Sequence, residues 1–215
     1  MILLDNNFLA WDGSSDYMRE VMIPCGKKFS MTQGFDMRLL NDENWPLMKK
    51  INWYNSSLDW KTREIVFGFD EYSMKEIVRE KLEMMKRSGY STSNTKFLLL
   101  YDYNTTLSQD LERLHVLNQY TAQGFWMRYR SINGTPKPEV KGYVDCKITD
   151  FPKNIFRVRG ARRNVRSFLA YLTEKGVQIP RECIRRDMTR DVEKKQHRLE
   201  VRLAMNKLMD SLEFN

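Results

Sequence analysis

The residues of this chain that are best suited to chemistry are polar side chains at the ends of short apolar runs. They are Asp5, Asn7, Gln33, Arg38, Asp70 and Arg128. When such runs form parallel strands, their carboxyl ends share one edge of the sheet, where α/β folds bind ligands. The planar guanidinium of Arg38 suits a carboxylate, and Asp70 can accept hydrogen bonds from hydroxyl groups. Each residue also has an ordinary alternative, in which it caps a helix or pairs with a charge on the surface.

Thiol and metal chemistry is not predicted. Cys25, Cys146 and Cys183 are widely separated, so they lack the close spacing of a zinc or iron–sulfur site. An odd number of distant cysteines is typical of free thiols in a reducing cytoplasm. We therefore expect a cytoplasmic protein without a metal site of its own.

The elements that would position the polar residues are clearest between Lys96 and Arg113. Residues 97–100 are an unbroken apolar run, the pattern of a strand buried on both faces. A polar turn follows, and Thr106 and Gln109 have the spacing of a capping box at the start of a helix. Strand, polar turn and capped helix make one β/α unit.

Similar alternation covers the first two thirds of the chain. We expect strands at residues 2–4, 28–33, 63–71, 97–100 and 125–130. Helices are expected at 14–22, after 41–42, from a capping box at 73–76 to Gly89, and from 106 to Gly124, with a loop at 52–61. This order predicts an α/β fold with a parallel sheet or barrel, and the short elements leave open which of the two forms. The Gly- and Pro-rich stretch 134–138 divides the chain into regions 1–135 and 136–215.

Composition agrees with one globular core. The chain has 215 residues, 41% of them hydrophobic and 30% charged, with a formal net charge of +8. No apolar run reaches the length of a membrane span, and Asp5 interrupts the apolar start before it resembles a signal peptide. We expect neither a membrane segment nor a membrane partner.

Five segments occur in an order that resembles a known family. They read LDNNFL from Leu4, TQGFDMRL from Thr32, FGFD from Phe67, KFLLLYDYNTTLSQDLER from Lys96, and GFWMRY from Gly124. This series is similar to the core domain of radical S-adenosylmethionine (SAM) enzymes over roughly residues 1–132. The resemblance implies a partial (β/α) barrel that contains units two to six of six.

The same resemblance implies which groups would bind and which are missing. Asp5 and Asn7 would lie near the SAM amino group, Gln33 and Arg38 would fill polar positions of the next unit, and Asp70 would accept from the ribose. Arg128 would face the cofactor or the substrate. The first unit of the family carries CxxxCxxC, whose thiolates hold a [4Fe–4S] cluster that cleaves SAM to a radical. This chain has no such run, so a preceding segment or a second chain would have to supply the cluster.

Region 136–215 is predicted to be an α+β extension: a hairpin within 140–158, a helix capped by Asn164 and closed by Gly176, and a long charged helix over 181–214. Its densest positive cluster contains Arg157, Arg159, Arg162, Arg163 and Arg166. Such a cluster can bind nucleic-acid phosphates. A solvated or acid-paired helix face is the more common explanation of such a run.

Three hypotheses remain open from the sequence. The chain is a split or truncated radical-SAM-type protein, or a degenerate barrel that binds nucleic acid or protein through its basic extension, or a scaffold without a ligand. The first predicts no activity for this chain alone. An incomplete barrel also leaves residues 2–4 as an unpaired strand edge, for which we expect a partner chain or a homodimer.

Overall fold

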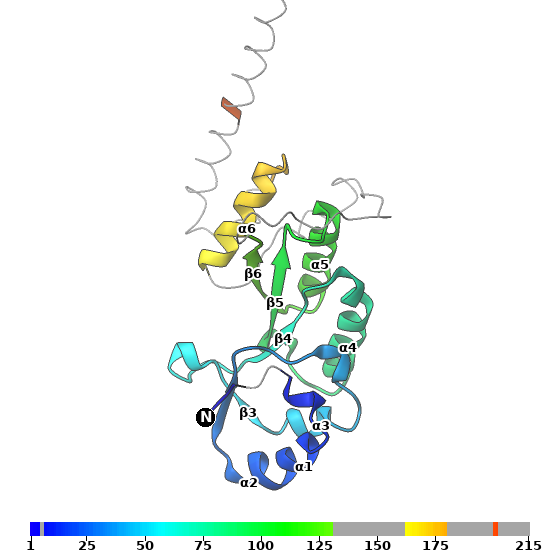
Figure 1. Cartoon of the computed structure of the whole chain (residues 1–215), viewed down its shortest axis with the longest axis vertical. Helices are drawn as coiled ribbons and strands as arrows, with labels where there is room; N and C mark the ends of the chain where they lie inside the picture. The colour runs from blue at the N-terminus through cyan, green and yellow to red at the C-terminus, as the bar shows by residue number, and fades with distance from the viewer. Residues whose placement is uncertain (5–6, 131–161, 180–199, 202–215) are drawn as a thin grey trace, which may run out of the picture.

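The computed structural model describes residues 1–4, 7–130, 162–179 and 200–201, and shows an α/β fold (Figure 1). The first half contains a small parallel sheet with the order β1-β2-β3. Its strands are β1 (Ile2–Leu3), β2 (Lys28–Met31) and β3 (Asn52–Trp53). The helices that connect them are short: α1 (Ser14–Tyr17), which continues through a π turn (Met18–Met22) into α2 (Ile23–Cys25), and α3 (Trp45–Met48).

The second half contains a larger parallel sheet with the order β4-β5-β6. Its strands are β4 (Ile65–Gly68), β5 (Thr95–Tyr101) and β6 (Gln123–Arg128). The helices that accompany it are α4 (Lys75–Arg87), α5 (Leu107–Gln119) and α6 (Arg162–Glu174). Short 3₁₀ turns occur at Phe8–Ala10, Met37–Leu39, Ser56–Leu58, Tyr72–Met74 and Thr92–Asn94.

The two sheets are joined at Phe35. After β2 the chain bends at Gly34, and Phe35 forms a parallel bridge with Phe67 of β4. The Phe35 N–H donates to the Val66 carbonyl at 2.8 Å, and the Gly68 N–H donates to the Phe35 carbonyl at 3.0 Å. The neighbouring parallel elements β1, β2, β4, β5 and β6 therefore follow one another in chain order.

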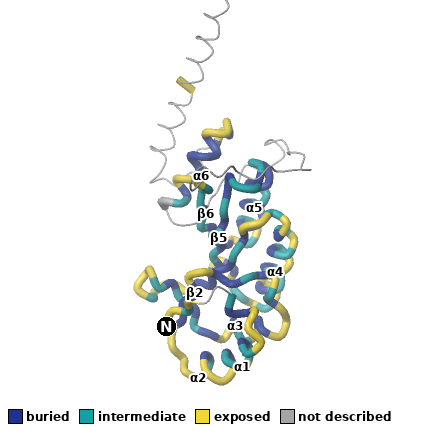
Figure 2. Tube along the Cα trace, in the orientation of Figure 1, coloured by how far each residue is buried: buried dark blue, intermediate teal, exposed yellow. Residues whose placement is uncertain are grey.

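Strand β5 has two unequal faces. Phe97, Leu99 and Tyr101 are fully buried, and Tyr101 packs against Phe168 of α6 with ring centroids 4.9 Å apart. Leu98 and Leu100 alternate with them along the strand and are only half-buried. Figure 2 shows buried and half-buried segments in the region of β5. The prediction of a strand buried on both faces is thus wrong for this strand, because in the described structure helices cover only one face completely.

Helix α5 begins as predicted. The Thr106 hydroxyl accepts a hydrogen bond from the Gln109 backbone N–H at 3.2 Å, and the Gln109 side-chain Oε1 accepts from the Thr106 backbone N–H at 2.9 Å. These two bonds are the reciprocal pair of a capping box, which satisfies N–H groups that the first turn leaves without helical partners.

A buried ion pair lies one turn further along α5. Asp110 and Arg113 are fully buried, and the Arg113 Nη2 lies 2.6 Å from the Asp110 Oδ1. The guanidinium also donates to the carbonyls of Phe69 at 2.8 Å and Leu100 at 2.7 Å. Arg113 therefore ties the carboxyl ends of β4 and β5 to the helix that follows β5. The second Asp110 oxygen accepts from the Tyr171 hydroxyl at 3.0 Å, which adds α6 to the same network.

Several expected elements differ in the structure. The expected capping box at 73–76 is wrong, since Met74 is the N-cap of α4 and the Ser73 hydroxyl donates to Glu71 instead. Residues 52–53, expected to be loop, pair with β2, and Gly124 lies inside β6 rather than at a helix end. Asn164 lies within α6 and donates to the Trp126 carbonyl, so it is not the cap.

The edge of the first sheet is exposed. The apolar run at residues 2–4 predicts a buried strand, but Ile2 is 50% and Leu4 81% exposed. This prediction is wrong because in the described structure β1 pairs with β2 on one side only. The hairpin within 140–158 and the boundary at 134–138 lie outside the described residues, and so does the long helix over 181–214 apart from residues 200–201.

Replacing Arg113 tests the buried ion pair. We expect Arg113→Met to lower the free energy of unfolding by about 3–5 kcal/mol, because it leaves the Asp110 carboxylate buried without its cation. Chemical denaturation measures this loss. The matched control is Arg79→Met, which breaks an exposed pair of the same i, i+3 spacing with Glu76 and should cost less than about 1 kcal/mol. Equal losses in the two variants would contradict the role given to Arg113.

Candidate functional site

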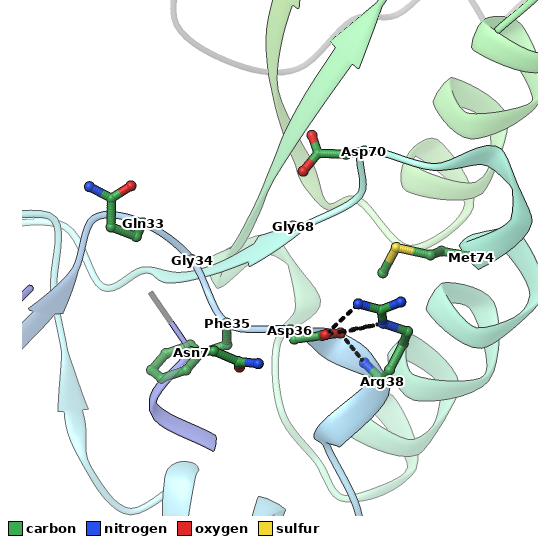
Figure 3. Close-up of a pocket in the computed structure, with 9 residues that line it drawn as sticks. All are labelled: Asn7, Gln33, Gly34, Phe35, Asp36, Arg38, Gly68, Asp70 and Met74. Carbon is green, nitrogen blue, oxygen red and sulfur yellow. Dashed lines mark hydrogen bonds and ion pairs between the residues drawn. The ribbon is translucent and has the colours of Figure 1, made fainter. Parts of the chain in front are cut away.

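Most of the polar residues predicted from the sequence meet in one cleft. It has a volume of about 210 Å³ and lies at the carboxyl ends of β1, β2 and β4 (Figure 3). Asn7, Gln33, Arg38 and Asp70 line it, which places four of the six candidate residues together. The other lining residues are Gly34, Phe35, Asp36, Gly68 and Met74. The parallel arrangement of the strands brings these side chains to one edge from distant parts of the chain.

Backbone forms the floor of the cleft. Gly34 has a φ of +82°, in the left-handed region that residues with a Cβ avoid. A Cβ at this position would lie 3.2 Å from the Phe67 carbonyl carbon and 3.4 Å from the Gly68 nitrogen. Gly34 thus lets the segment after β2 approach β4 closely, and Gly34 and Gly68 together add no side chain to the lining of the cleft. Figure 3 shows Gln33 and Asp70 on opposite sides of this floor.

Arg38 is held by Asp36, which is not among the site residues predicted from the sequence. Its Nε and Nη2 donate to the Asp36 carboxylate at 2.9 Å and 2.7 Å, and its backbone N–H donates to the same group at 3.0 Å. The hydrogen bonds from Arg38 hold the pKa of Asp36 below its ordinary value. The guanidinium fork therefore binds an internal carboxylate, and the i, i+2 spacing of Asp36 and Arg38 is the signal that could have revealed this pair.

Asp70 is the second carboxylate of the cleft. Asp70 is an exposed residue, yet the protein around its carboxyl removes part of the hydration and raises its pKa above the ordinary value, while Arg113 and a backbone hydrogen bond from Leu100 oppose the increase. The net direction is upward, so the ionised form of Asp70 is less well solvated in the fold than in the unfolded chain. A ligand that donates hydrogen bonds or carries positive charge would relieve this cost.

Arg128 does not belong to the cleft. Its Nε donates to the Asp102 carboxylate at 3.0 Å, its Nη1 donates to Glu174 at 2.7 Å, and its guanidinium lies over the Tyr171 ring. Arg128 thus connects the ends of β5 and β6 to α6. Asp102 lies in the polar turn that the sequence predicts after β5 and has a φ of +58° there, a conformation that Asp tolerates in turns.

For most of the remaining candidate binding residues, the structure does not describe the side chain. Asp5, Arg157 and Arg159 lie outside the described residues, and the side chains of Arg162 and Arg163 are not described. Arg166 is exposed on α6. Binding of nucleic acid through this arginine cluster therefore stays a prediction.

The described residues do not fit an iron–sulfur cluster. Cys25 is exposed on α2 and its thiol donates to the Met22 carbonyl, while the other two cysteines lie outside the described ranges. Among the described residues, no three His, Cys, Asp or Glu side chains are grouped so that they could hold a metal ion.

Comparison with family models, curated protein sequences and solved structures found no match to this chain. Of the helices in the described ranges, none has the length and apolar character needed to cross a membrane.

A substitution at Gly34 tests the close approach that forms the floor. Gly34→Ala should lower the unfolding free energy by more than the about 1–2 kcal/mol expected for a left-handed residue alone, because the new Cβ also crowds β4. The matched control is Gly89→Ala, which has a φ of +78° and no atom within 4 Å of the added Cβ. Thermal or chemical unfolding of both variants measures the difference. Equal losses would show that Gly34 contributes only its backbone conformation.

The pKa of Asp70 predicts a pH dependence of stability. A carboxyl whose folded pKa is raised binds more protons in the fold than in the unfolded chain, so its ionisation destabilises the fold as pH increases. Asp70→Asn should therefore raise the melting temperature slightly at pH 7. The gain should disappear below the ordinary carboxyl pKa of about 4. A loss of stability at pH 7 would contradict the direction of this shift.

Proposed function

We propose that this chain is the ligand-binding part of a radical-SAM-type barrel and that it binds SAM in the cleft at the ends of β1, β2 and β4. The observation that carries the proposal is the meeting of Asn7, Gln33, Arg38 and Asp70 in this cleft. The family resemblance implies a contact with SAM or its binding positions for these same four residues. They come from three separate β/α connections, so closeness along the chain does not explain their grouping.

The order of the strands supports a partial barrel. Neighbouring parallel elements β1, β2, β4, β5 and β6 follow the order of the chain when the Phe35–Phe67 bridge is included. A doubly wound sheet instead reverses its strand order at a switch point. Consecutive order is the connectivity of a β/α barrel. In this proposal the exposed outer edge of β1 is where the missing unit would pair.

The charges of the cleft suit SAM. The ionised side chains that line it are Asp36, Arg38 and Asp70, which sum to one net negative charge when both carboxylates are ionised. SAM has a sulfonium, an ammonium and a carboxylate, so its net charge is positive. Asp70 is suited to the ribose, since a carboxylate accepts from ribose hydroxyls in other nucleotide sites. Asn7 and Gln33 add amide groups that both donate and accept.

The small volume of the cleft supports a site that is completed by residues from another segment or chain. Small-molecule sites typically enclose about 300–1,000 Å³, whereas this cleft has about 210 Å³. It would cover part of SAM, and further residues would enclose the remainder. The described residues offer no thiolate cluster, so a [4Fe–4S] cluster would come from a preceding segment or a second chain. We accordingly propose no activity for this chain alone.

Titration calorimetry of the full chain with SAM tests the proposal. We expect binding without iron or sulfide, and about tenfold weaker binding for Gln33→Ala, because it removes a hydrogen-bonding amide from the cleft. The control is Gln119→Ala, an exposed glutamine at the end of α5. S-Adenosylhomocysteine, which lacks the sulfonium charge, should bind more weakly than SAM. Absence of SAM binding, or equal affinity in the two glutamine variants, would overturn the proposal.

A further inference from the structure

A second surface lies at the opposite ends of the strands. We define the amino-end basic surface as the exposed cations that lie at or shortly before the starts of β2, β3, β4 and β5. They are Lys27, Lys28, Lys49, Lys50, Lys61, Arg63, Lys86 and Arg87, and all eight are exposed. Because the strands are parallel, their amino ends lie together at the end of the fold that faces away from the cleft.

Hydrogen bonds show that one group of these cations is contiguous. Lys28 lies opposite Asn52 in the register of β2 and β3, and the Asn52 side chain accepts from Arg63 at 3.3 Å. The Lys28 ammonium donates to the Trp60 carbonyl at 2.8 Å, directly beside Lys61. These contacts bring residues from three separate segments to one place.

The remaining cations join the same end of the fold through α3 and α4. The Lys49 ammonium donates to the Ser88 carbonyl at 3.1 Å, next to Arg87, and Lys50 continues the chain toward β3. The electrostatic influence of Arg63 reaches Tyr90, two residues after Ser88. The surface therefore extends from the start of β2 to the end of α4.

Little negative charge compensates this surface. Across the described part of the chain, none of the eight cations forms an ion pair with a carboxylate within 4 Å. Asp59 and Glu64 are the acidic residues next to Lys61 and Arg63 in sequence, and Glu64 is buried against Lys96 at 2.6 Å. Glu83 precedes Lys86 and Arg87 by one turn of α4. Lys86 and Arg87 lie in the last turn of α4, where the helix dipole stabilises positive charge. A helix dipole does not account for Lys61 or Arg63, which follow a loop.

The loop within this surface holds an aromatic residue in an unusual backbone conformation. Asp59 and Trp60 are consecutive left-handed residues, with φ values of +51° and +58°. A bulky side chain seldom adopts this conformation, and such strain persists where the surrounding structure enforces it. The Trp60 N–H donates to the Asn55 carbonyl at 3.3 Å. The half-buried Tyr54 ring lies 4.3 Å from the Lys28 ammonium, so aromatic rings are interspersed with the cations.

We propose that the amino-end basic surface binds single-stranded nucleic acid. Exposed lysine and arginine side chains would neutralise successive phosphates, and the partly exposed Trp60 and Tyr54 rings would stack on bases, as in other single-strand sites. A single phosphate group could contact only a few of the eight cations, which are spread over four segments. An extended polyanion could contact all of them. The surface is independent of the cleft, so this inference does not rest on the proposed binding of SAM.

Fluorescence anisotropy of the full chain with a labelled oligouridylate of about 16 nucleotides tests the proposal. We expect binding that weakens steeply between about 50 and 200 mM salt. The test variant combines Lys27→Gln, Lys50→Gln and Lys61→Gln, whose side chains form no hydrogen bond or ion pair within the described ranges. It should bind about tenfold or more weakly and show a shallower salt dependence.

The control variant removes the same net charge elsewhere, through Arg19→Gln, Arg79→Gln and Lys175→Gln, and should keep nearly full affinity. Equal weakening of the two variants would overturn the proposal, because net charge alone would then explain the binding. Loss of affinity only on replacing Arg162 and Arg163 would also overturn it and would place the site in the C-terminal arginine cluster. Binding to anionic phosphatidylserine vesicles without binding to the oligonucleotide would overturn it in favour of a membrane surface.

Discussion

The buried ion pair between Asp110 and Arg113 is the interaction on which the second half of the fold depends. It spans one turn of α5, but its hydrogen bonds reach the carboxyl ends of β4 and β5 and the Tyr171 hydroxyl of α6. Two charges without solvent are tolerated because nearly every polar atom of the pair has a partner, and the Arg113 Nε is the exception within the described ranges. The pair thereby sets the relative position of two strands and two helices at the edge next to the cleft.

The cleft depends on this arrangement in two ways. Arg113 donates to the Asp70 carbonyl as well as to that of Phe69, so the ion pair fixes the backbone from which the Asp70 carboxyl projects. Its positive charge also moderates the increase in the pKa of Asp70. On the other side of the cleft, Gly34 permits the contact between β2 and β4 that joins the two sheets. Arg113 and Gly34 therefore position the side chains that would contact a ligand.

The two ends of the strands differ in charge. At the carboxyl ends, the carboxylates of Asp36 and Asp70 give the cleft a small negative charge, and Asp36 is paired with Arg38. The amino ends carry exposed cations that form no ion pair with a carboxylate in the described ranges. A parallel topology makes this separation possible, because every connection from strand to helix lies at one end and every return lies at the other. The two proposed ligands, SAM and single-stranded nucleic acid, would thus bind at opposite ends of the strands.

Local patterns in the sequence were sufficient to predict the α/β alternation, the capping box at Thr106 and the polar residues at the strand ends, because each depends on neighbouring residues. The resemblance to the radical SAM core selected Asn7, Gln33 and Asp70 as candidate ligands. Tertiary structure alone decided that Arg38 pairs with Asp36 and that Arg128 binds Asp102 and Glu174 away from the cleft, since a charged side chain selects its partner by proximity in space. It likewise decided which face of β5 is covered, because burial depends on helices that are distant in the chain.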